Sequence, residues 1–172
     1  MKTLYLLRHA KADRSNPAIS DYDRPLSDRG TATARSVGRT MRARGWLPQM
    51  VLCSAARRAV ETWEAVEPEL AASPSSINLR ELYLAPPTRL LSILHHQPKS
   101  VAAILLIGHN PGIASLVNAL AGPKSATPAI ARLGSGYPTA TLGLVSLAID
   151  AWTEIGRGES QLSHFLYPSD PT

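Results

Sequence analysis

Short continuous runs of hydrophobic residues recur along the chain, and each ends abruptly in a polar or charged residue. The first run is followed by Arg8 and His9, the second by Ser54, and the third by a glycine and His109. Continuous apolar runs of this kind are typical of parallel strands that are buried on both faces. We therefore expect three buried strands, which cover residues 4–7, 50–53 and 101–107.

Between these runs, apolar residues recur every three or four positions, which is typical of helices that cover a sheet. Ser27 is a suitable N-cap for the first such helix, and Gly45 follows its end. Pro111 suits the first position of the last one. The four expected helices run from Ser27 to Gly45, from Ser54 to Pro68, from Pro86 to His96 and from Pro111 to Gly122.

The remaining segments complete an alternating order of strands and helices. Residues 77–79 alternate weakly and predict a strand, and residues 141–149 predict another buried strand. Residues 123–138 are rich in Pro, Gly, Ser and Ala, which indicates a loop. Residues 152–165 predict an edge hairpin that turns at residues 156–158. The alternation predicts an α/β fold whose mostly parallel sheet is covered by helices on both faces.

The composition is that of one globular domain covering residues 1–172. The chain is 44% hydrophobic and 18% charged, as in folded rather than disordered proteins. No apolar run approaches the ~18 residues that a membrane span needs, so no membrane partner is expected. Cys53 is the single cysteine, which excludes an internal disulfide and favours a reducing, cytoplasmic location.

The formal net charge is +5, but the basic residues are dispersed and rarely interleaved with aromatic ones, so no nucleic-acid partner is expected. Several arginines nevertheless fall on the first expected helix. Their simplest interpretation is a solvated helix face, and the alternative is a docking surface for an acidic partner. The sequence leaves the oligomeric state open, with a monomer favoured. These arginines are Arg29, Arg35, Arg39, Arg42 and Arg44.

Charged side chains gather at the expected carboxyl ends of the strands, where ligands bind in open α/β sheets. A single histidine after an apolar run is usually structural, whereas His9 and His109 at two matching strand ends favour a functional pair. Arg57 and Arg58 lie in the first turn of a helix, where cations are unfavourable unless a nearby anion offsets their charge. The expected cluster contains Arg8, His9, Arg57 or Arg58, Glu81 and His109.

This cluster is a positive pocket with one carboxylate, and its chemistry fits phosphoryl transfer. Arginines bind phosphate through paired, charge-assisted hydrogen bonds and stabilise the charge of the transition state. A neutral imidazole is a competent nucleophile toward phosphorus. The sequence has neither a glycine-rich Walker loop nor paired aspartates for magnesium. We therefore predict phosphoryl transfer to a histidine, with no metal and no other cofactor.

Five segments, in the same order along the chain, resemble motifs of the histidine phosphatase superfamily in the form seen in SixA-like phosphohistidine phosphatases. The resemblance spans nearly the whole chain and implies a phosphoglycerate mutase-like fold, a three-layer α/β/α sandwich with a C-terminal edge hairpin. Ala10 departs from much of the wider superfamily, which has glycine there, but resembles the SixA-like members. The five segments are Leu7–Lys11, Asp23–Gly30, Ser54–Thr62, Glu81–Tyr83 and Gly108–Gly112.

Carried over residue by residue, the resemblance implies a mechanism. His9 attacks phosphorus and becomes phosphohistidine, and Glu81 acts as general acid and later as the base for water. The position of the acid varies across the superfamily, so a surface ion-pair role is the alternative for Glu81. The resemblance places the pocket arginine at Arg58 rather than Arg57. The implied phosphate ligands are Arg8, Arg58, His109 (which also counts as a catalytic residue) and Asn110.

The resulting prediction is a metal-independent phosphatase that removes phosphate from phosphohistidine in a protein. Two alternatives remain open at this point. One is a phosphomonoesterase acting on small molecules, and the other is a non-catalytic module that binds phosphoproteins on the same fold. The intact set of His9, Arg8, Arg58 and His109 favours an enzyme, because a binding module would not need a nucleophile.

Overall fold

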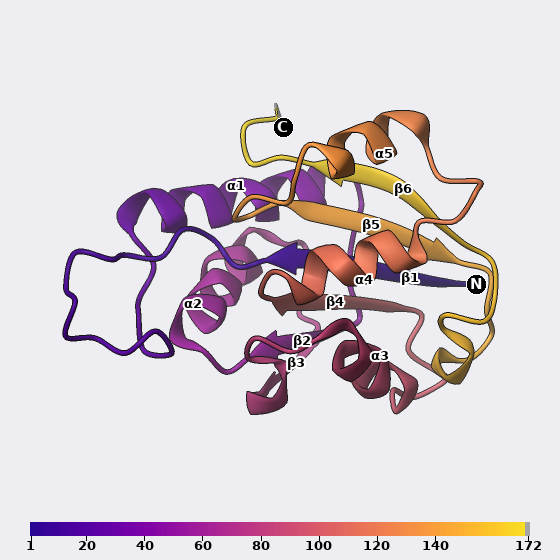
Figure 1. Cartoon of the computed structure of the whole chain (residues 1–172), viewed down its shortest axis with the longest axis horizontal. Helices are drawn as coiled ribbons and strands as arrows, with labels where there is room; N and C mark the ends of the chain where they lie inside the picture. Colours follow the sequence, from indigo (N-terminus) through magenta and orange to yellow (C-terminus); the bar gives the residue numbers. More distant parts are fainter. Residues whose placement is uncertain (171–172) are drawn as a thin grey trace.

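A six-stranded mixed sheet forms the centre of the computed structural model, which describes residues 1–170 (Figure 1). Its strand order is β3-β2-β4-β1-β5-β6. Neighbours among the first four are parallel, whereas β5 runs antiparallel to β1, and β6 antiparallel to β5. The expected mostly parallel sheet is therefore confirmed. The strands are β1 (Lys2–Arg8), β2 (Met50–Ser54), β3 (Ser75–Leu79), β4 (Ala103–Gly108), β5 (Leu142–Leu147) and β6 (Ser160–Leu166).

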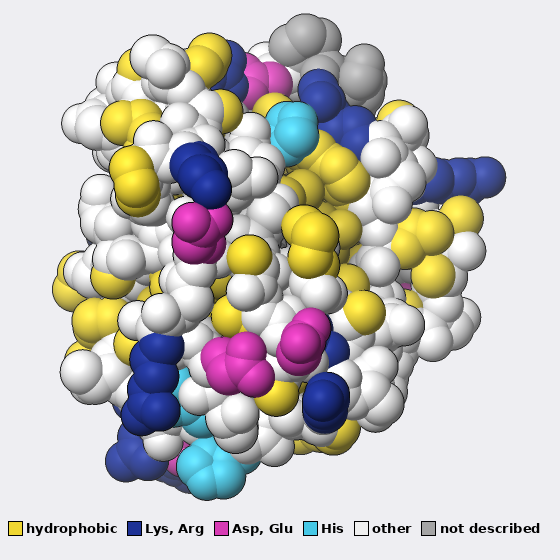
Figure 2. Space-filling view, turned by 90° about the vertical axis from the view of Figure 1, so that its right-hand side faces the viewer, with side chains coloured by type: hydrophobic (Ala, Val, Ile, Leu, Met, Phe, Trp, Pro, Cys, Tyr) yellow, Lys and Arg dark blue, Asp and Glu magenta, His cyan; other side chains and the backbone are white. Residues whose placement is uncertain are grey.

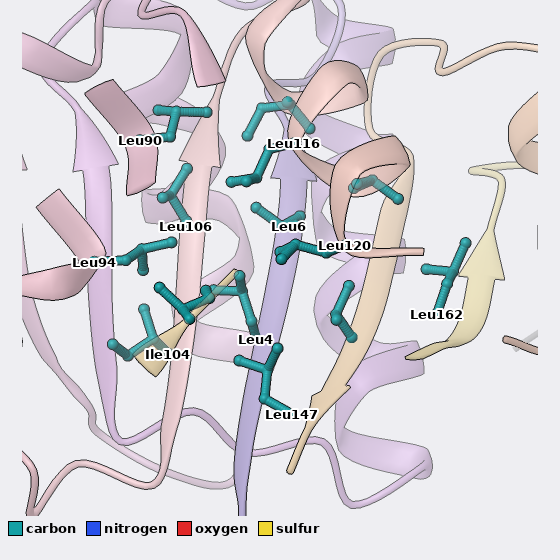
Figure 3. Packing of buried hydrophobic residues seen from close by; sticks show 14 of the residues in the cluster. Leu4, Leu6, Leu90, Leu94, Ile104, Leu106, Leu116, Leu120, Leu147 and Leu162 are labelled. Carbon is teal, nitrogen blue, oxygen red and sulfur yellow. The ribbon is translucent and has the colours of Figure 1, made fainter. Parts of the chain in front are cut away.

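Helices cover both faces of this sheet, because alternate side chains of the buried strands point to opposite sides. Along β1, Tyr5 and Leu7 pack in the cluster that contains the buried residues of α1 and α2. Leu4 and Leu6 pack in the cluster with α3, α4 and α5, as Figure 3 shows for the leucines of α3 and α4. The helices are α1 (Asp28–Ala43), α2 (Arg57–Val66), α3 (Pro87–His95), α4 (Gly112–Leu120) and α5 (Thr127–Gly134), with short 3-10 helices η1 (Glu67–Glu69), η2 (Arg80–Leu82) and η3 (Trp152–Glu154).

The start of α1 confirms the expected cap and ties the helix to the chain after β1. The hydroxyl oxygen of Ser27 accepts a hydrogen bond from the backbone N–H of Gly30 at 3.1 Å. The carbonyl of Lys11 accepts one from the backbone N–H of Ser27 at 2.9 Å. A Cβ at Gly30 would lie 2.2 Å from that same carbonyl oxygen, so only glycine permits this approach.

Two expectations about the C-terminal third are wrong in detail. The segment 123–138, expected as a loop, contains α5, whose Ala129 and Leu133 are buried four residues apart. The expected hairpin within residues 152–165 is instead formed by β5 and β6. Trp152 lies in η3 and not in a strand. Its side chain is fully buried, and its indole N–H donates to the carbonyl of Val101 at 2.8 Å.

No helix in residues 1–170 is long and apolar enough to cross a membrane.

Candidate active site

The two strand-end histidines meet because β1 and β4 are neighbours in register. Arg8 pairs with Gly108 across the two strands, so the next residues along each chain are His9 and His109. The backbone N–H of His9 donates to the carbonyl of Gly108 at 3.0 Å, which fixes the approach. The two imidazole rings lie with their centroids 5.0 Å apart. Strand topology alone therefore brings residues 100 positions apart into one site at the edge reached by the arrowheads on the left of Figure 1.

Arg58 joins the two histidines from the first turn of α2, which begins just after β2. Its Nε donates to Nε2 of His9 at 3.2 Å, and its Nη2 donates to Nδ1 of His109 at 3.3 Å. The residue is only 5% exposed. Arg57, one position earlier, is exposed and pairs with Glu61 at 2.6 Å. The structure thus brings Arg58, and not Arg57, to the strand-end histidines.

His9 is held as a neutral ring with a defined tautomer. Its Nδ1 lies 2.7 Å from the carbonyl oxygen of Ala10, which can only accept, so Nδ1 carries the proton. Nε2 therefore keeps its lone pair. Burial lowers the pKa of His9 to about 4, the hydrogen bond to Ala10 opposes that shift, and the charges of Arg58 and Arg8 add to it. At neutral pH this lone pair is present, and in the structure it accepts the hydrogen bond from Nε of Arg58.

His109 is neutral for a similar reason but has the opposite tautomer. Because the guanidinium of Arg58 only donates, Nδ1 of His109 accepts, and Nε2–H then donates to the hydroxyl of Ser54 at 2.8 Å. Burial lowers the pKa of His109 to about 3, with further lowering by His9 and Arg58. Ser54 is fully buried at the end of β2, so three strands and α2 converge on this pair of rings.

The side chains of Arg8 and Asn110 donate hydrogen bonds to the same backbone carbonyl. Nη1 of Arg8 donates to the carbonyl of Tyr137 at 2.8 Å, and Nδ2 of Asn110 donates to the same oxygen at 2.9 Å. Nε of Arg8 is buried with no hydrogen-bond partner among residues 1–170, as is Oδ1 of Asn110. An unpaired buried guanidinium donor is suited to an anionic oxygen. Burial, followed by the charges of Arg14 and Arg58, lowers the pKa of Arg8.

These residues lie at the bottom of a pocket of about 1030 Å³. We call Arg8, His9, Arg58 and His109 the pocket floor, and the basic residues Lys11, Arg14, Arg24 and Arg29 around it the pocket mouth. One wall is the irregular loop 11–26, drawn in indigo at the left of Figure 1, and another includes Pro168 and Ser169. At the amino ends of the strands, by contrast, basic, acidic and hydrophobic side chains are interspersed (Figure 2).

Glu81 is not brought to the pocket floor. It lies in η2, is exposed, and is not among the residues that line the pocket. Its neighbour Leu82 is fully buried, and successive residues of a 3-10 helix point about 120° apart, so the turn directs Glu81 outward. Among residues 1–170, no group of three or more His, Cys, Asp and Glu side chains could hold a metal ion.

A different carboxylate, which sequence reasoning missed, contacts the floor. Oδ2 of Asp21 accepts hydrogen bonds from Nη2 of Arg58 at 2.9 Å and from the hydroxyl of Tyr83 at 2.8 Å. Nη1 of Arg58 also donates to the backbone carbonyl of Asp21. Asp21 lies in an irregular loop without periodicity, so no local pattern distinguishes it from Asp13 or Asp23.

Comparison with known proteins yields a family and several close folds. A model of the histidine phosphatase superfamily (branch 1) matches residues 4–85. The uncharacterized protein ML1117 of Mycobacterium leprae is 30% identical over 165 residues, which cover 94% of this chain and 99% of that protein. The structure resembles the putative phosphohistidine phosphatase SixA from Agrobacterium tumefaciens, with a TM-score of 0.81, 29% identity, and coverage of 97% of this chain and 98% of that one. It also resembles the protein histidine phosphatase SixA complexed with tungstate, with a TM-score of 0.77, 25% identity, and coverage of 96% and 97%.

Proposed function

The chain belongs to the histidine phosphatase superfamily (branch 1), and from this premise we propose that it is a phosphatase that removes the phosphoryl group from phosphohistidine in a protein. The observation that carries the proposal is the state of His9. Its Nε2 keeps a lone pair, lies 3.2 Å from the guanidinium of Arg58, and belongs to a ring whose pKa is lowered to about 4. A neutral nucleophile beside fixed positive charge is what attack on a phosphoryl group requires.

In the proposed first step, Nε2 of His9 attacks phosphorus, and the bond from phosphorus to the leaving group breaks. Arg8, Arg58 and the second N–H of the Asn110 amide donate to the phosphoryl oxygens, and the two guanidinium groups stabilise the charge that spreads over them. His109 contributes once a phosphoryl dianion is bound, because a nearby negative charge raises the pKa of an imidazole and favours its protonated, donating form. Water then releases phosphate from His9.

The open mouth supports a protein substrate. Between Glu81 and His109, α3 and β4 use most of the chain, and of residues 82–108 only Leu84 lines the pocket. A small phosphoester would leave much of its surface in water, which weakens binding, whereas a side chain projecting from a protein gains contacts around the mouth. The likeness to the two SixA structures, at 29% and 25% identity over nearly the full length, supports the same substrate class.

The positive charge of the pocket mouth supports an acidic partner. Of the arginines of α1 that could form a docking surface, the structure favours the one at the mouth. An α-helix turns about 100° per residue, which sets Arg35, Arg39 and Arg42 within about 60° of one another and about 80° or more from Arg29. Only Arg29 of these lines the pocket, and Arg39 pairs with Glu69 at 3.4 Å. We therefore propose docking at the pocket mouth, with the other arginines of α1 as a solvated face.

The test compares substrates on the wild-type protein. We expect a higher kcat/KM for a histidine-phosphorylated protein than for sugar phosphates or nitrophenyl phosphate, and activity that a metal chelator does not change. A small ester turned over a hundredfold better than the phosphoprotein would instead establish a small-molecule phosphomonoesterase. Binding of the phosphoprotein without turnover of any substrate would establish a phosphoprotein-binding module.

A further inference from the structure

Asp21 is placed beside the proposed reaction by the same guanidinium that contacts the nucleophile. Nε of Arg58 donates to His9, and Nη2 of the same group donates to Oδ2 of Asp21 at 2.9 Å. One planar guanidinium therefore bridges the attacking nitrogen and the carboxylate. Asp21 also lines the pocket, and its side chain is 49% exposed there, whereas that of Arg58 is 6% exposed. The carboxylate can thus contact a ligand while it stays bound to Arg58.

The surroundings of Asp21 hold the carboxylate in place and keep it ionised. The hydroxyl of Tyr83 donates to Oδ2, and Nη1 of Arg24 lies 3.6 Å from Oδ1. The Tyr83 ring packs edge-on against the ring of His109, with the two centroids 5.4 Å apart. The Cζ atom of Arg58 lies 5.8 Å from the centroid of the Tyr83 ring. The hydrogen bond from Tyr83 lowers the pKa of Asp21; desolvation opposes this shift, and Arg58 and Arg24 add smaller lowering contributions. Such a carboxylate accepts hydrogen bonds but has no proton to donate.

An acceptor of this kind suits one class of leaving group. When His9 attacks a phosphohistidine, the new bond is from Nε2 to phosphorus, and the bond from phosphorus to the substrate ring nitrogen breaks. The electron pair of that bond stays on the departing nitrogen. If the other ring nitrogen carries a proton, the ring leaves as neutral imidazole, and no proton has to move. An alkoxide from a phosphate ester needs a proton as it leaves, which an ionised carboxylate cannot supply.

We propose that Asp21 is a specificity-determining residue whose carboxylate accepts a hydrogen bond from the free ring N–H of the substrate phosphohistidine. The hydrogen bond keeps the ring protonated and therefore a good leaving group. It gives phosphohistidine an advantage that phosphate esters do not share. This inference rests on the proposed function and adds the residue that selects the substrate within that site.

The decisive variant is Asp21→Asn, because its amide oxygen still accepts from Arg58 and Tyr83 while the negative charge is lost. Asp23→Asn is the matched control. It makes the same change in the same loop, at an exposed residue that does not line the pocket and bonds to Ser20. Each protein is assayed for kcat/KM on a phosphohistidine peptide and on nitrophenyl phosphate, and for inhibition by inorganic phosphate, which probes the arginines without a leaving group.

We expect Asp21→Asn to lower kcat/KM on the phosphohistidine peptide at least tenfold, and to change the value for nitrophenyl phosphate less than threefold. Inhibition by phosphate should not weaken, since a negative charge has been removed. The peptide rate of the variant should also fall more steeply than that of the wild type between pH 6 and 8, as the substrate ring loses its proton. Asp23→Asn should match the wild type throughout.

Three results would overturn the inference. Equal losses on both substrates would show that Asp21 only positions Arg58. An unchanged peptide rate would show that the substrate ring does not use this carboxylate. A wild-type protein that leaves the phosphohistidine peptide intact would remove the proposed function itself, and with it the role of Asp21, so the two failures are distinguishable.

Discussion

The pocket floor and the pocket mouth are built in different ways. The floor residues His9, Arg58 and His109 are buried, come from the ends of strands or the first turn of α2, and bond to one another. Of the mouth residues, Lys11, Arg14 and Arg29 are exposed, and the first two lie on an irregular loop. Buried hydrogen-bond donors suit phosphoryl transfer, and exposed charges suit the recognition of a partner.

The largest effect is expected at His9, the proposed nucleophile. His9→Ala should lower turnover by on the order of 10⁴-fold or more, while the protein still folds. The measurement is a quench in alkali after mixing with labelled substrate, because phosphohistidine survives alkali and is lost in acid. Wild-type protein should retain label, and the alanine variant should not. Label on the variant would move the nucleophile to another residue.

Arg58 and Arg57 give the sharpest contrast between a floor residue and a surface residue one position away. Arg58→Ala should cost about 2–4 kcal/mol of transition-state stabilisation, as for the loss of a donor to developing charge. Arg57→Ala should cost little, because Arg57 only pairs with Glu61 at the surface. The values of kcat/KM for the two variants give both costs. Equal losses, or the reverse order, would contradict the assignment of Arg58 to the floor.

The burial of the two histidines of the floor predicts how stability depends on pH. The pKa values of His9 and His109 are lowered to about 4 and about 3, below the ordinary value of 6.5. Between pH 6.5 and 4 the unfolded chain therefore binds more protons than the folded one, so stability falls as the pH falls. The loss should be on the order of 5 kcal/mol across that range, roughly half of it from each histidine.

Denaturant unfolding at a series of pH values measures this loss. In His109→Gln the dependence on pH should be flatter, because one buried neutral histidine is gone. His96→Gln, at the exposed end of α3, is the control and should keep the wild-type slope. Parallel slopes for all three proteins would mean that the floor histidines are protonated as readily as in water.

The pocket mouth should respond through substrate affinity rather than through chemistry. The double change Arg14→Ala with Arg29→Ala should raise KM for an acidic phosphoprotein roughly threefold to tenfold and reduce its dependence on salt. The rate on nitrophenyl phosphate should change little. Arg35→Ala with Arg42→Ala removes the same charge from another side of α1 and should leave KM unchanged. If the control pair raises KM more than the Arg14 and Arg29 pair does, the docking surface would be the row of arginines along α1 instead of the pocket mouth.

The difference between floor and mouth also explains how much the sequence could predict. Continuous apolar runs and an alternating order of elements indicate a parallel sheet, and the carboxyl ends of its strands then bring His9, His109 and the first turn of α2 together. No such pattern in the sequence indicates that Asp21 belongs to the site. Its contact with Arg58 depends on how an irregular loop folds back over α2, which is a matter of tertiary structure.

The missed elements have local physical causes of the same kind. The short helix α5 (Thr127–Gly134) buries only Ala129 and Leu133, so its periodicity is weak beside the Pro and Gly of the segment. Trp152 was expected in a strand of the hairpin, but the need to bury a large ring and bond its N–H places it in η3. Parallel pairing of buried strands follows from the pattern of apolar runs along the chain, whereas these details depend on individual side chains.

Glu81 should give the smallest effect. The resemblance to the family makes it the candidate general acid, yet it is exposed in η2 and does not line the pocket. An imidazole with its second nitrogen protonated leaves without a proton donor, so Glu81→Gln should lower kcat/KM on a phosphohistidine peptide less than threefold. Asp21→Asn, which changes a carboxylate that touches the floor, provides the comparison in the same assay. A loss of a hundredfold in Glu81→Gln would mean that the loop after β3 moves Glu81 into the pocket when substrate binds, and the acid would then belong to the floor.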